Sequence, residues 1–99
     1  MKNNLINSNY DIVSSNKFNR QLRREAKRGK DIKKISYVIN SLAQGLELEP
    51  RYCDHMLKDD KTFNKCRECH IEPDWLLVYK CVDNTLYLVA TGSHSDLFE

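Results

Sequence analysis

The sequence contains no long hydrophobic run: no stretch reaches the roughly 18 consecutive apolar residues that a membrane-spanning helix requires. The N-terminus, Met1-Lys2-Asn3-Asn4, leads into polar sequence and lacks the apolar segment of a secretory signal peptide. The absence of both features predicts a protein that neither spans a membrane nor is exported. We therefore expect a cytoplasmic protein.

Compact metal-ligand spacing is also absent. The three histidines, His55, His70 and His94, lie far apart in the sequence, and no pair has a spacing such as H-x3-H. Cys66, Cys69 and His70 do match the C-x-x-C-H pattern of haem attachment, but that reaction requires export. In a strand, positions 66 and 69 would point to opposite faces, which suits neither a haem, a metal nor a redox pair. We predict no metal and no cofactor.

The length of 99 residues predicts one domain, residues 1–99, with a single modest core. Residues 1–7 are polar, and we expect them to be flexible. Without an export signal, the cysteines are expected to be free thiols in a reducing compartment: Cys53, Cys66, Cys69 and Cys81.

The net charge of +2 conceals a strongly basic segment at residues 17–34. This segment has a net charge of +7 and the remaining residues sum to −5, because it contains only two acidic residues and these basic ones: Lys17, Arg20, Arg23, Arg24, Lys27, Arg28, Lys30, Lys33 and Lys34. Such a density of positive charge is typical of nucleic-acid binding. A solvated helix face would have the same composition, so charge alone leaves both interpretations open.

The first half of the chain predicts one strand and two helices. Residues 9–14 read as a short strand. Ser15 or Asn16 can cap a helix over 17–28 that ends at Gly29. Asp31 then caps a second helix that runs to about residue 44, and its apolar residues recur at helical spacing. Two helices joined this tightly form a hairpin that must bury its apolar side against another element.

The last third predicts an antiparallel sheet. The expected strands cover 66–71, 75–81 and 85–91, and Asp83-Asn84 supports a tight turn between the last two. Residues 46–65 show no clear periodicity and form a long loop. The predicted fold is α+β, with an antiparallel sheet of about four strands packed against the N-terminal helical hairpin.

These turn positions predict that chemically active side chains meet at one end of the sheet. His70 and Trp75 flank the turn at 72–74, and a two-residue turn at 83–84 places Trp75 roughly opposite Gly92. His70, Asp74 and residues 90–94 therefore converge, and His55 lies in a loop that can reach them. Two histidines beside a carboxylate and an indole favour general acid–base chemistry.

Simpler structural roles remain possible for the same residues. A single histidine at a strand end is usually a polar residue with satisfied hydrogen bonds, and only their grouping favours chemistry. Trp75 and Phe98 can equally be packing residues of the core or of an edge.

Three segments together resemble the YafQ branch of the RelE superfamily, the toxins of bacterial type II toxin–antitoxin pairs. The similarity covers residues from about 16 to the C-terminus and includes the basic hairpin. The segments that carry it are Tyr52-Cys53-Asp54-His55-(x)-Leu57-Lys58, the run Arg67-Glu68-Cys69-His70-Ile71-Glu72-Pro73-Asp74-Trp75-Leu76-Leu77-Val78-Tyr79-Lys80, and Thr91-Gly92-Ser93-His94-Ser95-Asp96-Leu97-Phe98.

This resemblance implies a ribosome-dependent endoribonuclease that cuts mRNA in the ribosomal A site without a metal. The 2′-hydroxyl of the substrate is the nucleophile, which restricts cleavage to RNA. By position, His55, His70, Asp74 and His94 match the acid–base residues of the family, with His94 as the general acid. Residues implied to hold mRNA or ribosomal RNA are Trp75, Phe98, Arg67, Lys17, Arg20, Arg23, Arg24 and Lys27.

One position departs from the family pattern. The family usually has arginine immediately before the Thr91-Gly92-Ser93-His94 run, whereas this sequence has Ala90. Loss of that transition-state cation should cost about 3–4 kcal/mol, or about 10²–10³ in rate. The toxin is then naturally weakened, or another cation such as Arg67 or Lys58 replaces the arginine, or the residue was changed so that the host tolerates the protein.

The resemblance also implies partners. These are the ribosome, mRNA and a DinJ-like or RelB-like antitoxin whose acidic C-terminal segment folds onto the basic toxin; no membrane is involved. The alternative function is a toxin homologue that binds antitoxin and ribosome but has lost cleavage.

Overall fold

The structure is a computed structural model that describes residues 9–58 and 60–98; the prediction of flexibility for residues 1–7 lies outside them. The described chain forms a sheet and helices in the following order: β1 (Asp11–Ser14), α1 (Asn16–Lys27), α2 (Ile32–Ala43), the 3-10 helix η1 (Pro50–Tyr52), β2 (His55–Met56), β3 (Arg67–Glu72), β4 (Trp75–Val82), β5 (Thr85–Gly92) and α3 (His94–Phe98).

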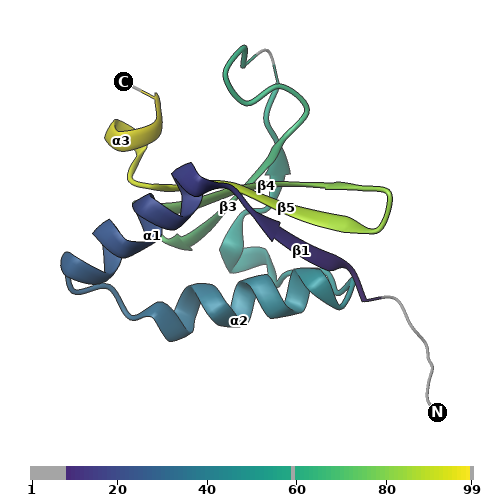
Figure 1. Cartoon of the computed structure of the whole chain (residues 1–99), viewed down its shortest axis with the longest axis horizontal. Coiled ribbons are helices and arrows are strands. Elements are labelled where there is room, and N and C mark those ends of the chain that lie inside the picture. Colours follow the sequence, from purple (N-terminus) through teal and green to yellow (C-terminus); the bar gives the residue numbers. More distant parts are fainter. Residues whose placement is uncertain (1–8, 59, 99) are drawn as a thin grey trace.

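The predicted α+β fold with a helical hairpin is confirmed, and the sheet has five strands in the order β1-β5-β4-β3-β2 (Figure 1). The fifth strand is the two-residue β2, which forms within the segment predicted as a loop and pairs with β3. The sheet is mixed, because β1 pairs with β5 in parallel. These two strands are separated by the hairpin and three further strands, so no tight turn forces them to be antiparallel.

Both predicted helices and their end signals are present. The Ser15 hydroxyl accepts a hydrogen bond from the Phe18 amide at 2.9 Å, and the Asp31 carboxylate accepts one from the Lys33 amide at 3.0 Å. Gly29 follows α1 with a φ of 91°, a conformation that favours glycine. No helix in residues 9–58 and 60–98 combines the length and the apolar character needed to cross a membrane.

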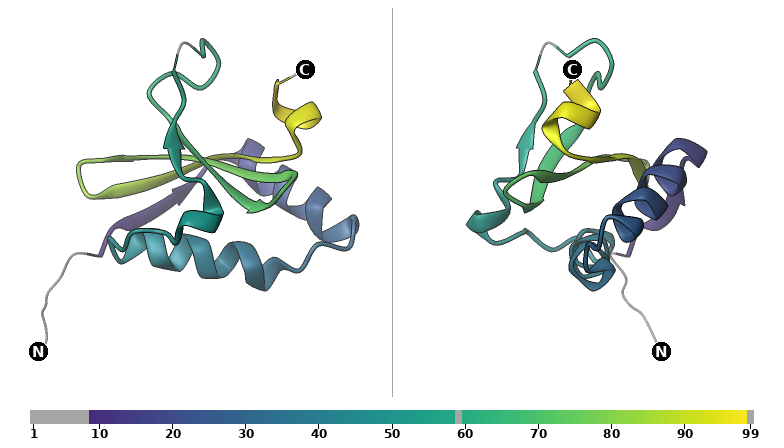
Figure 2. Two further views of the ribbon diagram at one scale, coloured as in Figure 1. Left: turned by 180° about the vertical axis from the view of Figure 1, so that it is seen from behind. Right: turned by 90° about the vertical axis from the view of Figure 1, so that its left-hand side faces the viewer.

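The sheet separates two apolar clusters. The main core lies between the sheet and the helical hairpin and includes Phe18, Ile35 and Trp75. On the opposite face, α3 and the loop between β2 and β3 rise from the sheet (Figures 1 and 2), and a smaller cluster forms there. Cys69 belongs to the main core and Cys66 to the smaller cluster, so the two thiols point to opposite faces as predicted. All four cysteines are free thiols.

The β4–β5 hairpin sets which residues meet at the end of the sheet. Asp83 and Asn84 have positive φ values of 50° and 64° and form the predicted two-residue turn, because Val82 pairs with Thr85. The register shifts by one residue after Val78, so Leu76 rather than Trp75 lies opposite Gly92. This bulge was not visible in the alternation of the sequence.

The structure corrects the expectation that Trp75 stacks on mRNA. Its side chain has 0% exposure, and its indole N–H donates to the Thr91 hydroxyl at 3.0 Å. The Thr91 hydroxyl in turn donates to the Leu76 carbonyl. Trp75 opens a strand that is buried on both faces, which the sequence shows as an unbroken apolar run. Both ring faces are covered, so Trp75 is a core residue.

We expect Trp75→Ala to lower the free energy of unfolding by about 3–5 kcal/mol, because it leaves a large cavity and removes the hydrogen bond from the indole to the Thr91 hydroxyl. Trp75→Phe should cost less, since it retains most of the buried volume. Urea denaturation followed by circular dichroism measures both changes. A loss below about 1 kcal/mol for Trp75→Ala would contradict the assignment to the core.

Candidate active site

Three histidines gather on the sheet face that the helical hairpin leaves open. Successive strand residues alternate between faces, so Cys69 and Ile71 of β3 enter the main core while Glu68 and His70 point to the open face. β2 pairs with β3 so that His55 lies opposite Glu68. The grouping predicted from turn positions is therefore present, and the loop that carries His55 does reach it.

Glu68 lies between two imidazoles and was missed by the sequence analysis. One carboxylate oxygen, Oε1, is 3.5 Å from His55 Nε2 and 3.6 Å from His70 Nε2, and the side chain is 6% exposed. The Nδ1 atom of His55 donates to the Cys53 carbonyl, and that of His70 to the Pro73 carbonyl. These bonds leave both Nε2 atoms facing the carboxylate, where a proton can be shared. Glu68 stands two residues before His70 on one strand, which places both side chains on the same face. This spacing was the sequence signal for Glu68.

His94 is held by Asp74, which the fold brings from the β3–β4 turn. Both the backbone N–H and the ring Nδ1–H of His94 donate to Asp74 Oδ1, each at 2.9 Å. These bonds hold the pKa of Asp74 below its ordinary value, the backbone bond contributing most. The ring of His94 lies 5.7 Å from that of His70 and 6.3 Å from that of Phe98. The Nε2 atom of His94 is therefore available for proton transfer beside the other two histidines.

A carboxylate and two imidazoles in this cluster have the geometry of a possible metal site. Glu68, His70 and His94 each offer one ligand atom, and these atoms lie within 4.8 Å of one another. Oxygen and imidazole nitrogen ligands suit a divalent ion such as zinc. No short ligand spacing indicates this set in the sequence, because the fold brings its members together.

Neither Ala90 nor Arg67 places a positive charge in the histidine cluster. Ala90 is fully buried on the open face of the sheet, in the cluster that contains Phe63 and Val78. Arg67 points to the other face, where its Nε donates to Asp54 at 3.3 Å, and Asp54 raises the pKa of Arg67. The structure thus does not bring Arg67 into the histidine cluster.

The basic segment divides into exposed and paired residues. Lys30 and Lys34 each bind Glu72 at 2.9 Å, and Arg24 and Arg28 bind carboxylates of α1 and α3. The exposed basic residues of α1 are Lys17, Arg20, Arg23 and Lys27. Phe98, at the end of α3, is also exposed, and its ring lies 5.5 Å from that of Phe63.

An ionic network attaches α3, and with it His94, to α1. Asp96 accepts a hydrogen bond from Arg28 at 2.7 Å and one from the Ser93 amide at 2.8 Å. Arg28 also binds Glu25, whose side chain is 2% exposed. The hydrogen bond from Arg28 is the main reason that the pKa of Asp96 lies far below its ordinary value.

The fold and this cluster define a class: a RelE-like α+β protein with a group of histidines and carboxylates on the open face of its sheet. A family model described as "Bacterial toxin of type II toxin-antitoxin system, YafQ" matches residues 10–99. The mRNA interferase toxin YafQ of Escherichia coli strain B is 37% identical over 89 residues, covering 89% of this chain and 95% of the relative. The chain belongs to the YafQ family of type II toxin–antitoxin toxins.

Solved structures of proteins with similar sequences have the same fold. A YafQ chain in a crystal structure of the E. coli DinJ–YafQ complex superposes with a TM-score of 0.83 and 36% identity, over 91% of this chain and 99% of that one. A metal-bound toxin from Helicobacter pylori superposes with a TM-score of 0.83 and 44% identity, over 90% of this chain and 99% of the other.

We expect Asp96→Asn to lower the free energy of unfolding by about 1–3 kcal/mol at neutral pH, since it removes charge-assisted hydrogen bonds. Because the pKa of Asp96 is lowered by folding, its stabilisation is complete above an ordinary aspartate pKa of about 4 and declines as the pH falls below it. Denaturation experiments between neutral and strongly acidic pH should therefore show that the difference in free energy of unfolding between Asp96→Asn and the parent chain becomes smaller as the pH falls.

Asp83→Asn, at the exposed turn, is the matched control and should have little effect at any pH. A difference for Asp96→Asn that stays constant down to strongly acidic pH would contradict the ionic role of this carboxylate.

Proposed function

We propose that the chain is a ribosome-dependent endoribonuclease that cleaves mRNA in the ribosomal A site of the bacterial cytoplasm. The observation that carries this proposal is the pairing of His94 with Asp74 beside His70, Glu68 and His55. Membership of the YafQ family, whose E. coli relative is named an mRNA interferase toxin, supports the same activity.

Cleavage requires an acid for the leaving 5′-oxygen. His94 takes this role, because Asp74 holds its Nδ1 and leaves Nε2 free to donate a proton. The lowered pKa of Asp74 keeps this carboxylate ionised near neutral pH, so that it continues to accept the Nδ1–H of His94.

Cleavage also requires a base for the 2′-hydroxyl. Glu68 and His70, whose facing atoms are 3.6 Å apart, form the base that removes this proton, and His55 supports Glu68 from its other side. The 2′-oxygen then attacks the phosphorus, and the bond to the 5′-oxygen breaks as His94 protonates it. No metal takes part in this sequence of steps.

The third requirement is positive charge near the phosphorane-like transition state. In the family pattern an arginine stands at the position of Ala90, and here the position is an apolar, buried one on the face of the site. Arg67 is engaged with Asp54 on the other face, which argues against its substitution for that arginine. The chain therefore acts as a weakened nuclease.

The remaining charged surface contacts the ribosome and the antitoxin. The exposed residues Lys17, Arg20, Arg23 and Lys27 bind ribosomal RNA phosphates in a salt-dependent manner, and Phe98 stacks on mRNA beside His94. A DinJ-like antitoxin, as found in the complex of the E. coli relative, neutralises this surface through an acidic segment.

Ala90 favours a second candidate function. Without the cation, cleavage can fall so low that the chain acts only by binding antitoxin and ribosome. The two candidates differ in one observable, the appearance of cut mRNA.

We expect Ala90→Arg to increase mRNA cleavage by about 10²–10³, because it restores a cation at the developing negative charge. Cut sites are mapped by primer extension on programmed ribosomes for the parent chain, Ala90→Arg and Ala90→Arg combined with His94→Ala. The added His94 substitution should abolish the gain, since the acid is then absent.

Thermal unfolding of each variant separates loss of catalysis from loss of fold. If neither the parent chain nor Ala90→Arg cuts while both bind ribosomes, the nuclease function is wrong and the binding function is supported.

A further inference from the structure

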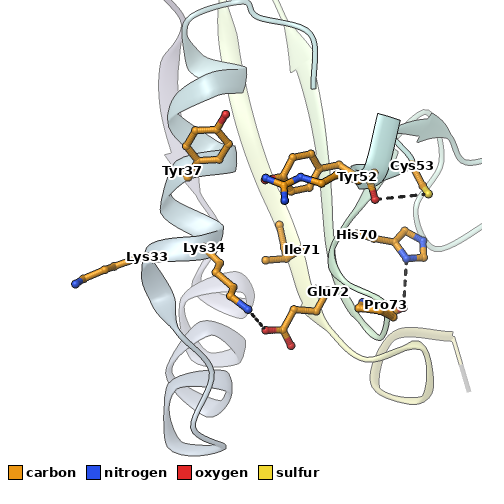
Figure 3. Close-up of a pocket in the computed structure, with 10 residues that line it drawn as sticks. Lys33, Lys34, Tyr37, Tyr52, Cys53, His70, Ile71, Glu72 and Pro73 are labelled. Atoms are coloured by element: carbon orange, nitrogen blue, oxygen red, sulfur yellow. Dashed lines mark hydrogen bonds and ion pairs between the residues drawn. The ribbon is translucent and has the colours of Figure 1, made fainter. Parts of the chain in front are cut away.

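A cavity of about 850 Å³ adjoins the histidine cluster. It lies between α2, η1 and the part of β3 beyond its pairing with β2 (Figure 3). Tyr37, Tyr52, Ile71 and Pro73 supply most of its wall, and His70 forms the wall nearest the proposed active site. Its volume is within the range of small-molecule sites and exceeds that of one nucleotide.

Aromatic and guanidinium surfaces are presented side by side in this cavity. The ring of Tyr37 is 6.4 Å from that of Tyr52, and Tyr37 is 50% exposed whereas Tyr52 is buried. Arg51 lies 4.8 Å above the Tyr52 ring, and its Nη2 donates to the Tyr52 hydroxyl. The Arg51 side chain is 71% exposed, and its Nη2 lies 3.9 Å from Glu49 Oε2 at the edge of the guanidinium. Rings and guanidinium planes are the surfaces on which proteins stack unpaired bases.

The charge of the cavity is positive. Lys34 points toward Glu72 (Figure 3). Lys30 binds the same carboxylate, so two ammonium groups share it. Arg51 adds a further charge, and Lys33 lies at the rim and points outward. Phosphate groups are attracted to such a site, and acidic groups of a protein partner are attracted as well.

The position of the cavity next to His70 favours RNA over an acidic segment of a protein as its occupant. An RNA strand with its scissile phosphate among His70, His94 and Glu68 must place a neighbouring nucleotide within one backbone step of His70, and the cavity begins there. The buried Trp75 cannot supply a stacking surface for that nucleotide.

We propose that this cavity binds the base of one RNA nucleotide adjacent to the scissile phosphate, stacked against Tyr37 and the outer face of Arg51. The assignment rests on the proposed nuclease function and adds to it a subsite outside the acid–base cluster. Lys34 and Arg51 attract the neighbouring phosphate, and His70 links the subsite to the reacting atoms.

The first test measures binding to the full chain without cleavage. The probe is a fluorescein-labelled RNA of about eight nucleotides, 2′-O-methylated so that it lacks the nucleophile. We expect Tyr37→Ala to weaken binding by about tenfold in fluorescence anisotropy, and Tyr37→Phe to retain it. Tyr87→Ala is the matched control, because Tyr87 is a tyrosine that is not fully buried and lies on β5, outside the cavity.

The second test uses thiols that the chain already contains. Cys53 lines the cavity and is exposed, and Cys81, also exposed, lies outside it. Saturating probe RNA should slow alkylation of Cys53 by iodoacetamide several-fold and leave Cys81 unchanged, as measured by peptide mass spectrometry. Tyr37→Ala should remove this protection at the same RNA concentration.

The outcomes separate the subsite from the nuclease function. Tyr37-dependent binding and Cys53 protection without any mRNA cleavage would support the subsite while refuting the nuclease. The subsite alone would be overturned by a different result: the parent chain cuts mRNA, but Tyr37→Ala does not weaken RNA binding and RNA does not slow the alkylation of Cys53. Protection of Cys53 by E. coli DinJ but not by RNA would also overturn it and assign the cavity to a protein partner.

Discussion

The structure depends on one physical constraint, the two-sidedness of a sheet that is covered on a single face. Each β3 residue must point either into the core beneath the helical hairpin or to the open side. Cys69 and Ile71 take the first direction, and this fixes Glu68 and His70 in the second. The hydrophobic packing that stabilises the fold therefore also orients the proposed catalytic side chains, although none of them lies in the main core.

The C-terminal helix is attached to this frame by charge. Asp96 joins α3 to α1 through Arg28, while Asp74 receives both the backbone and the ring N–H of His94. A five-residue helix contributes little stability of its own, because its nucleation is unfavourable. Its position, and that of His94, thus depends on these ionic and hydrogen-bonding contacts together with the packing of Leu97 and Phe98 against the smaller apolar cluster.

The proposed function depends on how the sheet and the C-terminal helix meet. The sheet provides Glu68 and His70, the β3–β4 turn provides Asp74, and α3 provides His94. Ala90 lies among apolar residues beside them, so the cluster has proton donors and acceptors but no adjacent cation from β5. The cavity beyond His70 extends the same surface with aromatic and guanidinium groups. In the proposed function, proton transfer and substrate holding are thus distributed over separate elements.

The sequence by itself determined the helices, their caps at Ser15 and Asp31, the turn at 83–84 and the convergence of His70, Asp74 and His94, because these depend on local geometry and periodicity. Only the tertiary structure decided the contacts made across the sheet. It buried Trp75, placed Glu68 between two imidazoles and turned Arg67 toward Asp54. These outcomes depend on which strand face is covered and on a one-residue bulge, and neither is encoded in the spacing of neighbouring residues.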